Sequence, residues 1–221
     1  MIELVFVIVV LGILASLAMG RMDRDLRQEA ASTILSHIRL TQQLALRDNK
    51  HRSDNDLRWQ NGYWEWRYTL CGSGDIYYQI KSDGSNGTLG GGANQQNEAA
   101  IDPISGKYIF LPTTYCTNRN KGSNNSENVA VTEKYGISKI ERSGGCASGG
   151  TRRYIAFDYL GRPHHGRNGY NQPNFTNIMT TDCNLTFTLS TDQDNNGTMD
   201  SFIITVKSES GHSFIVGQEN L

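Results

Sequence analysis

MIELVFVIVVLGILASLAM, residues 1–19, is an almost unbroken apolar run; its one carboxylate is Glu3, and the next charged residue is Arg21. At ~1.5 Å rise per residue, a helix of this length is enough to cross the ~30 Å hydrocarbon core of a bilayer. The first interpretation is therefore a transmembrane helix. Glu3 complicates that interpretation, because a carboxylate inside hydrocarbon costs roughly 2.5–3.5 kcal/mol and usually has a partner or a function.

Three interpretations of the apolar run compete. A cleavable signal peptide requires a basic stretch before the run and a cleavage site after it, whereas this run passes into a helical pattern. A single-pass anchor would keep Glu3 close enough to the membrane surface to stay hydrated. In the third interpretation, the helix leaves the membrane and packs against copies of itself, and a neighbouring copy neutralises Glu3.

The motif Ile2-Glu3-Leu4-Val5, followed by VIVVLGILA at 7–15, resembles the N-terminal helix of type IV pilins and of type II secretion pseudopilins. The resemblance covers residues 1–50, and the remainder matches only in general layout. It implies that a prepilin peptidase removes a short basic leader from the precursor. It also implies that the mature chain begins with an N-methylated phenylalanine two residues before Met1.

The resemblance assigns assembly roles to Glu3, Gly12 and Gly20. In the family, the carboxylate at Glu3 pairs with the terminal amine of an adjacent subunit, which removes a buried unpaired charge and helps to fix the axial register. The alternative is an interfacial carboxylate with no assembly role. Each glycine costs a helix roughly 1 kcal/mol relative to alanine, and Gly20 stands where many pilins carry a proline. The helix between the glycines either loses helicity on assembly or uses them for close packing.

Beyond Arg21 the helical pattern becomes amphipathic, and one stripe is expected to face the rest of the protein. The stripe consists of Met22, Leu26, Ala30, Ile34, Ile38, Thr41 and Ala45. Because Asp48-Asn49-Lys50 is polar and turn-prone, the helix is expected to end there. The predicted domains are therefore the N-terminal helix, residues 1–50, and a globular head, residues 51–221.

The composition fits an extracellular head held together by disulfides. The chain has 221 residues, 37% of them hydrophobic, and its net charge of -1 is too near zero to suggest nucleic-acid binding. All four cysteines, Cys71, Cys116, Cys146 and Cys183, lie outside the first helix in a region rich in Gly, Asn, Ser and Thr, which is typical of an oxidising compartment. Four cysteines allow three connectivities. The preferred pairing is Cys71 with Cys116 and Cys146 with Cys183.

Strand patterns fill the head. Residues 63–70 alternate between an apolar face that carries Trp64 and Trp66 and a polar face that carries Glu65 and Arg67. Further strands are predicted at 76–81, 153–159, 184–189, 201–206 and 213–216, the last three as an antiparallel meander. In the segment 101–110, a turn is expected to lead into one more strand. Strands that follow one helix favour an α+β, pilin-like fold in which a long N-terminal helix packs against an antiparallel sheet. The segment 157–163, FDYLGRP, resembles H-type pseudopilins.

One loop in the head carries the ligand pattern of a calcium site. Asp192, Asp194, Asn196 and Asp200 offer side-chain oxygens at alternate positions, and Thr198 offers its carbonyl after a glycine that permits a sharp turn. This spacing resembles an EF-hand-type loop. Position twelve is Ile203 rather than a bidentate Glu, so a modest affinity is expected. A polar hairpin loop without metal is the alternative.

Five Asn-x-Ser/Thr sequons occur, at Asn86, Asn124, Asn174, Asn184 and Asn196. In a head so rich in asparagine, chance accounts for most of them. Asn184 and Asn196 are the candidate glycosylation sites, because each has an aspartate two residues earlier, which resembles the extended sequon of some bacterial systems. A glycan on Asn196 would compete with calcium.

The sequence predicts a structural protein rather than an enzyme, since no nucleophile motif accompanies its histidines. The expected function is a pilin, a subunit of an extracellular type IV pilus-like filament. The alternatives are a type II secretion pseudopilin and a membrane-anchored, calcium-dependent binding module. The expected partners are copies of the chain, the inner-membrane assembly machinery and prepilin peptidase. The expected localisation is the bacterial inner membrane before assembly, then an extracellular filament or a periplasmic pseudopilus. Long polar loops favour a surface-exposed subunit with a role such as adhesion.

Overall fold

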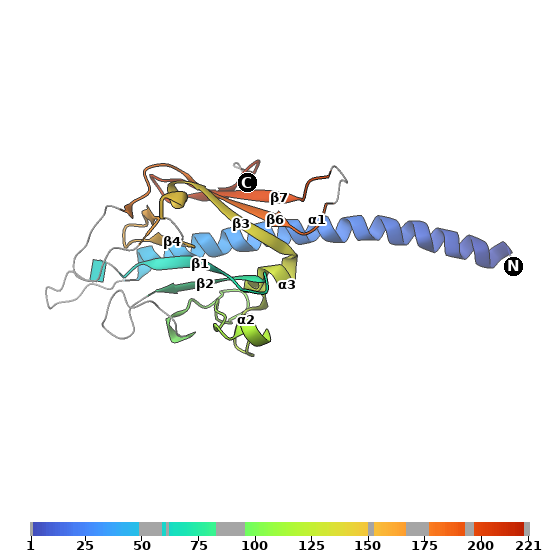
Figure 1. The fold of residues 1–221 in the computed structure, drawn as a ribbon, viewed down its shortest axis with the longest axis horizontal. Helices are drawn as coiled ribbons and strands as arrows, with labels where there is room; N and C mark the ends of the chain where they lie inside the picture. The colour runs from blue at the N-terminus through green and yellow to red at the C-terminus, as the bar shows by residue number, and fades with distance from the viewer. Residues whose placement is uncertain are drawn as a thin grey trace.

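The protein consists of one long helix and a head of two sheets (Figure 1). The computed structural model describes residues 2–48, 59–60, 62–82, 96–149, 153–166, 177–192 and 197–218; of residues 2, 3, 14–25, 148 and 149 it describes the backbone only. The helix α1 (Ile2–Arg47) has 46 residues, a length of ~70 Å. Its N-terminal part extends beyond the head, and its C-terminal part lies between the sheets and beside α3 (Figure 1).

The apolar stripe of α1 packs into the head as predicted. Its buried members are Ala30, Ile34, Ile38, Thr41 and Ala45, none more than 4% exposed, and Leu26 packs at the edge of the same core. The predicted stripe residue Met22 lies outside the described side chains. The head therefore folds around the C-terminal part of α1, which supplies one wall of the hydrophobic core.

The first sheet has the strand order β2-β1-β4-β5, with all neighbours antiparallel. Its strands are β1 (Trp64–Leu70), β2 (Ile76–Ser82), β4 (Tyr154–Phe157) and β5 (Pro163–His164). On β1, the prediction that Glu65 faces solvent is wrong. Glu65 is 2% exposed, and its Oε1 lies 3.3 Å from Nε of Arg67. Every residue of β2 is buried, because other parts of the head cover both of its faces.

The second sheet has the order β3-β6-β7-β8 and is also antiparallel. Its strands are β3 (Ile137–Gly144), β6 (Cys183–Leu189), β7 (Ser201–Val206) and β8 (Ser213–Ile215). The run β6-β7-β8 confirms the predicted C-terminal meander. Short helices complete the head: η2 (Gln96–Glu98), α2 (Tyr115–Asn118), η3 (Glu127–Val129), α3 (Val131–Tyr135) and η4 (Gly145–Gly149).

The predicted fold class requires correction. The chain is a mixed α+β protein with two antiparallel sheets, not one sheet packed on a long apolar helix. The apolar residues 4–13 of α1, whose side chains are described, lie outside the head. Among the described residues, no helix is both long and apolar enough to cross a membrane, so the predicted transmembrane helix is not found.

The strand predicted after the turn in 101–110 is also wrong. Tyr108 forms isolated bridges with Ile101 and Asn125 instead of joining a ladder. The 101–108 segment is therefore a short hairpin whose tip lies next to α1.

Both disulfides confirm the preferred pairing. Cys71–Cys116 joins the β1–β2 turn to α2, and Cys146–Cys183 joins η4 to β6, with Cα–Cα distances of 5.2 and 5.0 Å. The chain around the second bond passes very close to itself: Gly144 has φ +68, and a Cβ there would collide with the carbonyl oxygen of Asp182. Glycine is required at this position for both reasons.

Candidate functional site

The most unusual surface of the protein is the apolar segment, defined here as residues 4–11 of α1. Its eight side chains are Leu4, Val5, Phe6, Val7, Ile8, Val9, Val10 and Leu11, and they are between 38% and 70% exposed. A soluble amphipathic helix hides its apolar residues along one stripe, whereas this segment is apolar on every side. Contiguous apolar surface of this kind marks a site that another molecule covers.

The three predicted assembly residues, Glu3, Gly12 and Gly20, lie on the N-terminal half of α1, outside the apolar segment itself. Glu3 is helical, and its side chain lies outside the described residues, as do the surroundings of Gly20. Gly12 is exposed, and a Cβ built on it would meet nothing within 4 Å. Gly12 thus leaves a notch in the apolar surface just after the apolar segment, on the side that carries Val5 and Ile8.

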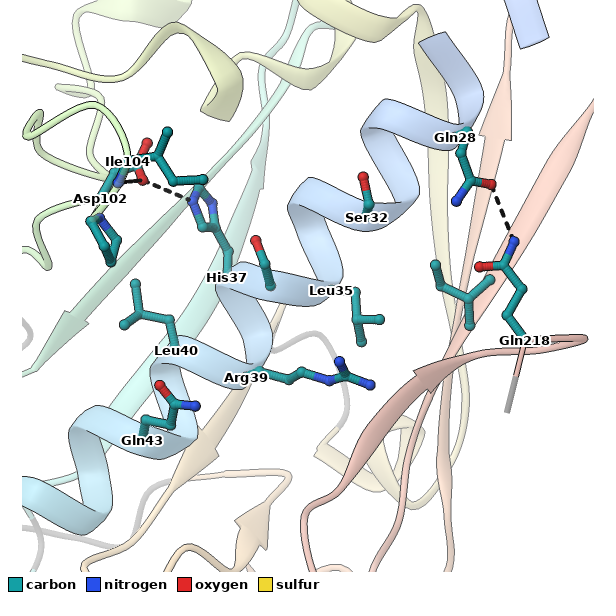
Figure 2. A pocket seen from close by; sticks show the side chains of 13 residues that line it. Gln28, Ser32, Leu35, His37, Arg39, Leu40, Gln43, Asp102, Ile104 and Gln218 are labelled. Carbon is teal, nitrogen blue, oxygen red and sulfur yellow. Dashed lines mark hydrogen bonds and ion pairs between the residues drawn. The ribbon is translucent and has the colours of Figure 1, made fainter. Parts of the chain in front are cut away.

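A groove runs along the exposed face of α1 within the head, and the sequence analysis missed it (Figure 2). It has a volume of about 440 Å³, and α1 forms its floor. The hairpin tip with Pro103 and Ile104 forms one wall, and Ile215 and Gln218 form the other. The available signal was the spacing of Gln28, Ser32, Ser36 and Gln43, a helical stripe of uncharged residues opposite the buried one.

His37 lies on α1 at the edge of the groove, next to the 101–108 hairpin, within a buried polar cluster. Its Nδ1 shares a 2.6 Å hydrogen bond with the Tyr78 hydroxyl, and its Nε2 lies 4.0 Å from Oδ1 of Asp102. Burial lowers the pKa of His37 to about 4, although the negative charge of Asp102 acts in the opposite direction. The ring is therefore neutral at pH 7, and the Tyr78 hydroxyl, whose pKa burial raises, donates to it.

Asp102 organises the hairpin tip beside His37. Its Oδ1 accepts from the Ile104 N–H at 2.9 Å, and its Oδ2 accepts from the Ser105 hydroxyl at 2.7 Å. Burial alone would raise the pKa of Asp102, but these hydrogen bonds and His37 together lower it below its ordinary value. The ionised carboxylate thus holds the turn in one conformation.

The predicted calcium loop is described only in part, because Asp194 and Asn196 lie outside the described residues. Oδ2 of Asp192 accepts from the Gly197 N–H at 2.9 Å, and Oδ1 of Asp192 is buried and has no hydrogen-bond partner among the described residues. Oδ1 of Asp200 lies 3.6 Å from Nη1 of Arg27. Among the described residues, no contact supports a ligand role for the Thr198 carbonyl. Within the described ranges, no group of three or more His, Cys, Asp or Glu side chains could hold a metal ion.

Of the two candidate glycosylation sites, only Asn184 is described; Asn196 is not. Asn184 lies in β6 opposite Thr205, and its Oδ1 accepts from the Thr205 hydroxyl at 2.8 Å. The side chain is therefore engaged within the sheet.

The segment FDYLGRP closes a buried turn at Asp158. This carboxylate is fully buried and accepts from Arg162 Nε at 2.8 Å and from His164 Nε2 at 3.0 Å. Burial is the largest influence on the pKa of Asp158 and raises it, yet the hydrogen bonds from His164 and Arg162 outweigh it and lower the pKa. His164 is fully buried and stacks on Tyr63.

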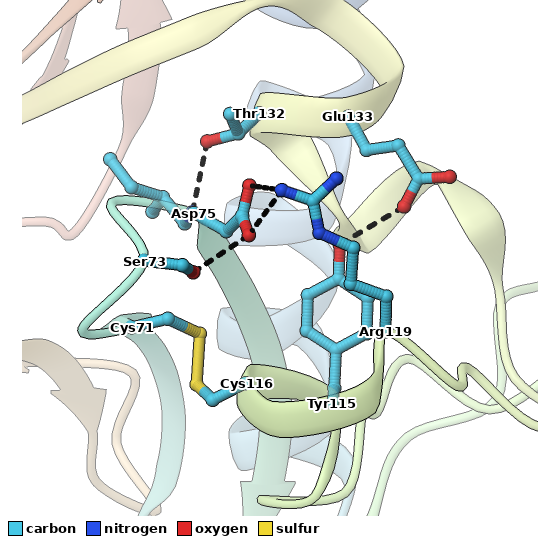
Figure 3. The surroundings of a disulfide bond; sticks show 9 residues. Cys71, Ser73, Asp75, Tyr115, Cys116, Arg119, Thr132 and Glu133 are labelled. Atoms are coloured by element: carbon cyan, nitrogen blue, oxygen red, sulfur yellow. Dashed lines mark hydrogen bonds and ion pairs between the residues drawn. A yellow bond between two sulfur atoms is a disulfide. The ribbon is translucent and has the colours of Figure 1, made fainter.

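A second polar cluster surrounds the Cys71–Cys116 disulfide (Figure 3). Both side-chain oxygens of Asp75 accept from the Arg119 guanidinium, at 3.0 and 2.8 Å, and the Ser73 hydroxyl donates to Asp75. Arg119 takes the left-handed conformation at the end of α2, with φ 55. The ion pair and the disulfide together fasten α2 to the β1–β2 turn.

Neither a protein-family model, nor a curated protein, nor a solved structure matches the chain. Its function is therefore inferred from the apolar segment and from the sequence motifs.

Proposed function

We propose that the protein is a pilin, a structural subunit of an extracellular, type IV pilus-like helical filament that assembles through the N-terminal part of α1. One observation carries the proposal: eight consecutive apolar side chains, residues 4–11, are exposed on a helix that extends beyond the head (Figure 1). The motif Ile2-Glu3-Leu4-Val5 supports the same class of protein by resemblance.

The amount of exposed apolar surface is sufficient to drive assembly. Residues 4–11 expose on the order of 800 Å² of side-chain surface, similar to the ~800 Å² that each partner contributes to a standard protein–protein interface. At ~25 cal/mol per Å², covering this surface contributes about 20 kcal/mol before the costs of association are subtracted. Copies of the chain provide the cover, because each brings an identical apolar helix.

The remaining parts of the proposal follow from the resemblance. Glu3 would pair with the terminal amine of the adjacent subunit, because a charge buried in such a helix bundle requires a partner. Prepilin peptidase would process the precursor, and an inner-membrane machinery would add subunits. The protein would then occur at the bacterial inner membrane before assembly and in an extracellular filament afterwards.

Two alternatives remain, each favoured by one feature. The FDYLGRP segment, which closes the buried turn at Asp158, favours a type II secretion pseudopilin in a periplasmic pseudopilus. Oδ1 of Asp192, which is buried and unpaired within the described part of the chain, favours a calcium-dependent binding module, because such an oxygen suits a cation ligand. In the second alternative, the chain never polymerises.

The test is electron microscopy of material sheared from cells that produce the full-length chain, with mass spectrometry of any filament found. We expect filaments composed mainly of this protein, and we expect Ile8→Lys to abolish them because it places a charge within the apolar segment. Leu70→Lys is the matched control: Leu70 is 44% exposed on the head, so its substitution should leave filaments intact. Filaments that persist in the Ile8 variant, or that lack this chain, would refute the proposal.

A further inference from the structure

The groove on α1 is suited to a second apolar helix. Two small residues, Ser32 and Ser36, lie one turn apart on its floor, and Leu35 and Leu40 flank them. Each serine hydroxyl already donates within α1, Ser32 to the Glu29 carbonyl at 3.1 Å and Ser36 to the Thr33 carbonyl at 2.8 Å. Because these hydroxyls are satisfied, a second helix can cover the two serines without leaving either hydroxyl donor unpaired. Small residues also allow two helix backbones to approach closely.

The charge of the groove matches an uncharged partner. The cationic residue among its lining side chains is Arg39, and its Nε donates to the Ser213 carbonyl at 3.0 Å. The groove's acidic residue, Asp102, is 2% exposed and accepts hydrogen bonds from its own turn. A charged ligand would therefore find few free counter-charges in the groove. An apolar helix has no charged groups that would need them.

One wall of the groove carries an exposed apolar side chain, Ile104, on a rigid turn. Ile104 is 93% exposed at the tip of the 101–108 hairpin. Asp102 fixes that tip through its side chain, Pro103 fixes the backbone, and the Gly106 N–H donates to the Asp102 carbonyl at 2.9 Å. Such a preorganised aliphatic side chain has the properties of an interface anchor, since little conformational entropy is lost when it is buried.

The chain itself contains the complementary shape. Gly12 forms a notch in the exposed apolar surface of residues 4–13, and a Cβ added there would meet nothing within 4 Å. The notch lies ~40 Å along the same helix from the groove, so the two cannot meet within one molecule. They can meet only between copies, by a head-to-tail contact that leaves both surfaces available again at the ends.

We propose that the groove on α1 receives the apolar segment of a second copy, so that Ile104 of the first copy packs into the notch at Gly12 of the second. This proposal rests on the proposed filament. This contact fixes where one copy stops along the helix of the next. Its predicted consequence is a register: residue 104 of one copy lies next to residue 12 of the other and away from residue 5.

Engineered cysteines test the register, since the two disulfides occupy all four native cysteines. The double variant Gly12→Cys with Ile104→Cys should form a ladder of disulfide-linked multimers in oxidised filaments. The matched control, Val5→Cys with Ile104→Cys, moves the first thiol two turns, ~10 Å, along α1. That is beyond the ~7 Å between Cα atoms that a disulfide can bridge. We expect at least tenfold more multimer from the first variant.

A second pair of variants leaves out the engineered thiols. Ile104→Ala should reduce filament yield several-fold, whereas Ile101→Ala, at the base of the same hairpin and 55% exposed, should not. Both proteins should melt at the wild-type temperature, because neither side chain is buried.

The outcomes separate the two proposals. Four outcomes with normal filaments would overturn the register but not the proposed filament. They are no 12–104 ladder, equal ladders from the 5–104 and 12–104 variants, only 104–104 dimers, or residue 104 linked to another protein. Normal filament yield from Ile104→Ala would also overturn it. If the wild-type chain forms no filament at all, the proposed function fails, and the register fails with it.

Discussion

Asp158→Ala is the substitution with the largest effect expected on the fold. The carboxylate is fully buried, and its Oδ1 accepts from the backbone N–H groups of Leu160 and Arg162, both at 3.0 Å. Its Oδ2 accepts from the Arg162 guanidinium and from His164, whose Nδ1 has no partner within the described ranges. Removing one member of such a buried network costs about 3–5 kcal/mol, because the donors that remain are stranded. For a protein of this size, the melting temperature should fall by roughly 6–20 °C.

The assay is thermal and urea unfolding of the full chain in a mild detergent. Asp182→Ala is the matched control, because Asp182 also pairs with a cation, Lys207 at 2.7 Å, but at the surface. Exposed pairs contribute at most ~1 kcal/mol, so the control should unfold almost as the wild type does. The pKa of Asp158 is lowered in the folded state; its contribution is therefore present above the unfolded pKa of 3.8 and is lost as the pH falls below it. A loss under ~1 kcal/mol in Asp158→Ala would refute the reasoning.

Two further predictions concern the groove wall and the loop at Asp192. The folded pKa of His37 is about 4, whereas the ordinary pKa of histidine is 6.5, so the unfolded chain binds more protons between these values. Stability should therefore fall by about 3 kcal/mol from pH 6.5 to 4, and urea titrations of wild type and His37→Gln check this. A wild-type profile that is flat over this window, or as steep in the variant, would contradict it. Millimolar calcium should raise the melting temperature, since a ligand at 100 times its Kd adds ~2.7 kcal/mol, and Asp192→Asn should abolish the shift. Equal melting with calcium and with chelator would end the calcium hypothesis.

The elements with clean periodicity were predictable from sequence. The 3.6-residue spacing of Ala30, Ile34 and Ile38 predicted the buried face of α1. The strand predicted at 201–206 has the observed bounds of β7.

The failures have local physical causes. β3 was missed because a bulge between Ile137 and Lys139 shifts the register, so its buried residues Ile137 and Ile140 are three apart rather than two or four. Glu65 was assigned to solvent, but β1 lies between two neighbouring strands, and the head covers both of its faces. Two sheets were not distinguished from one, because strand pairing between distant segments leaves no periodic signal.

The groove was not predictable for a different reason. Its floor was visible as the uncharged stripe of α1, but its wall depends on a contact between α1 and a hairpin 65 residues after His37. The Asp102 side chain holds that hairpin in place through hydrogen bonds that no spacing rule encodes. Exposure of Ile104 follows from the same contact, since the turn points its tip residue away from the core.

The form of the apolar segment also determines what kind of assembly can cover it. Successive residues of an α-helix are ~100° apart, so eight exposed apolar residues distribute over the full circumference. A two-fold dimer would cover one side of each helix and leave the opposite side in water. Covering all sides requires several neighbouring copies around each segment. A groove ~40 Å away on the same rigid helix supplies one of these neighbours with an axial offset. Contacts that are offset and unlike at the two ends do not close on themselves, and they extend into a filament.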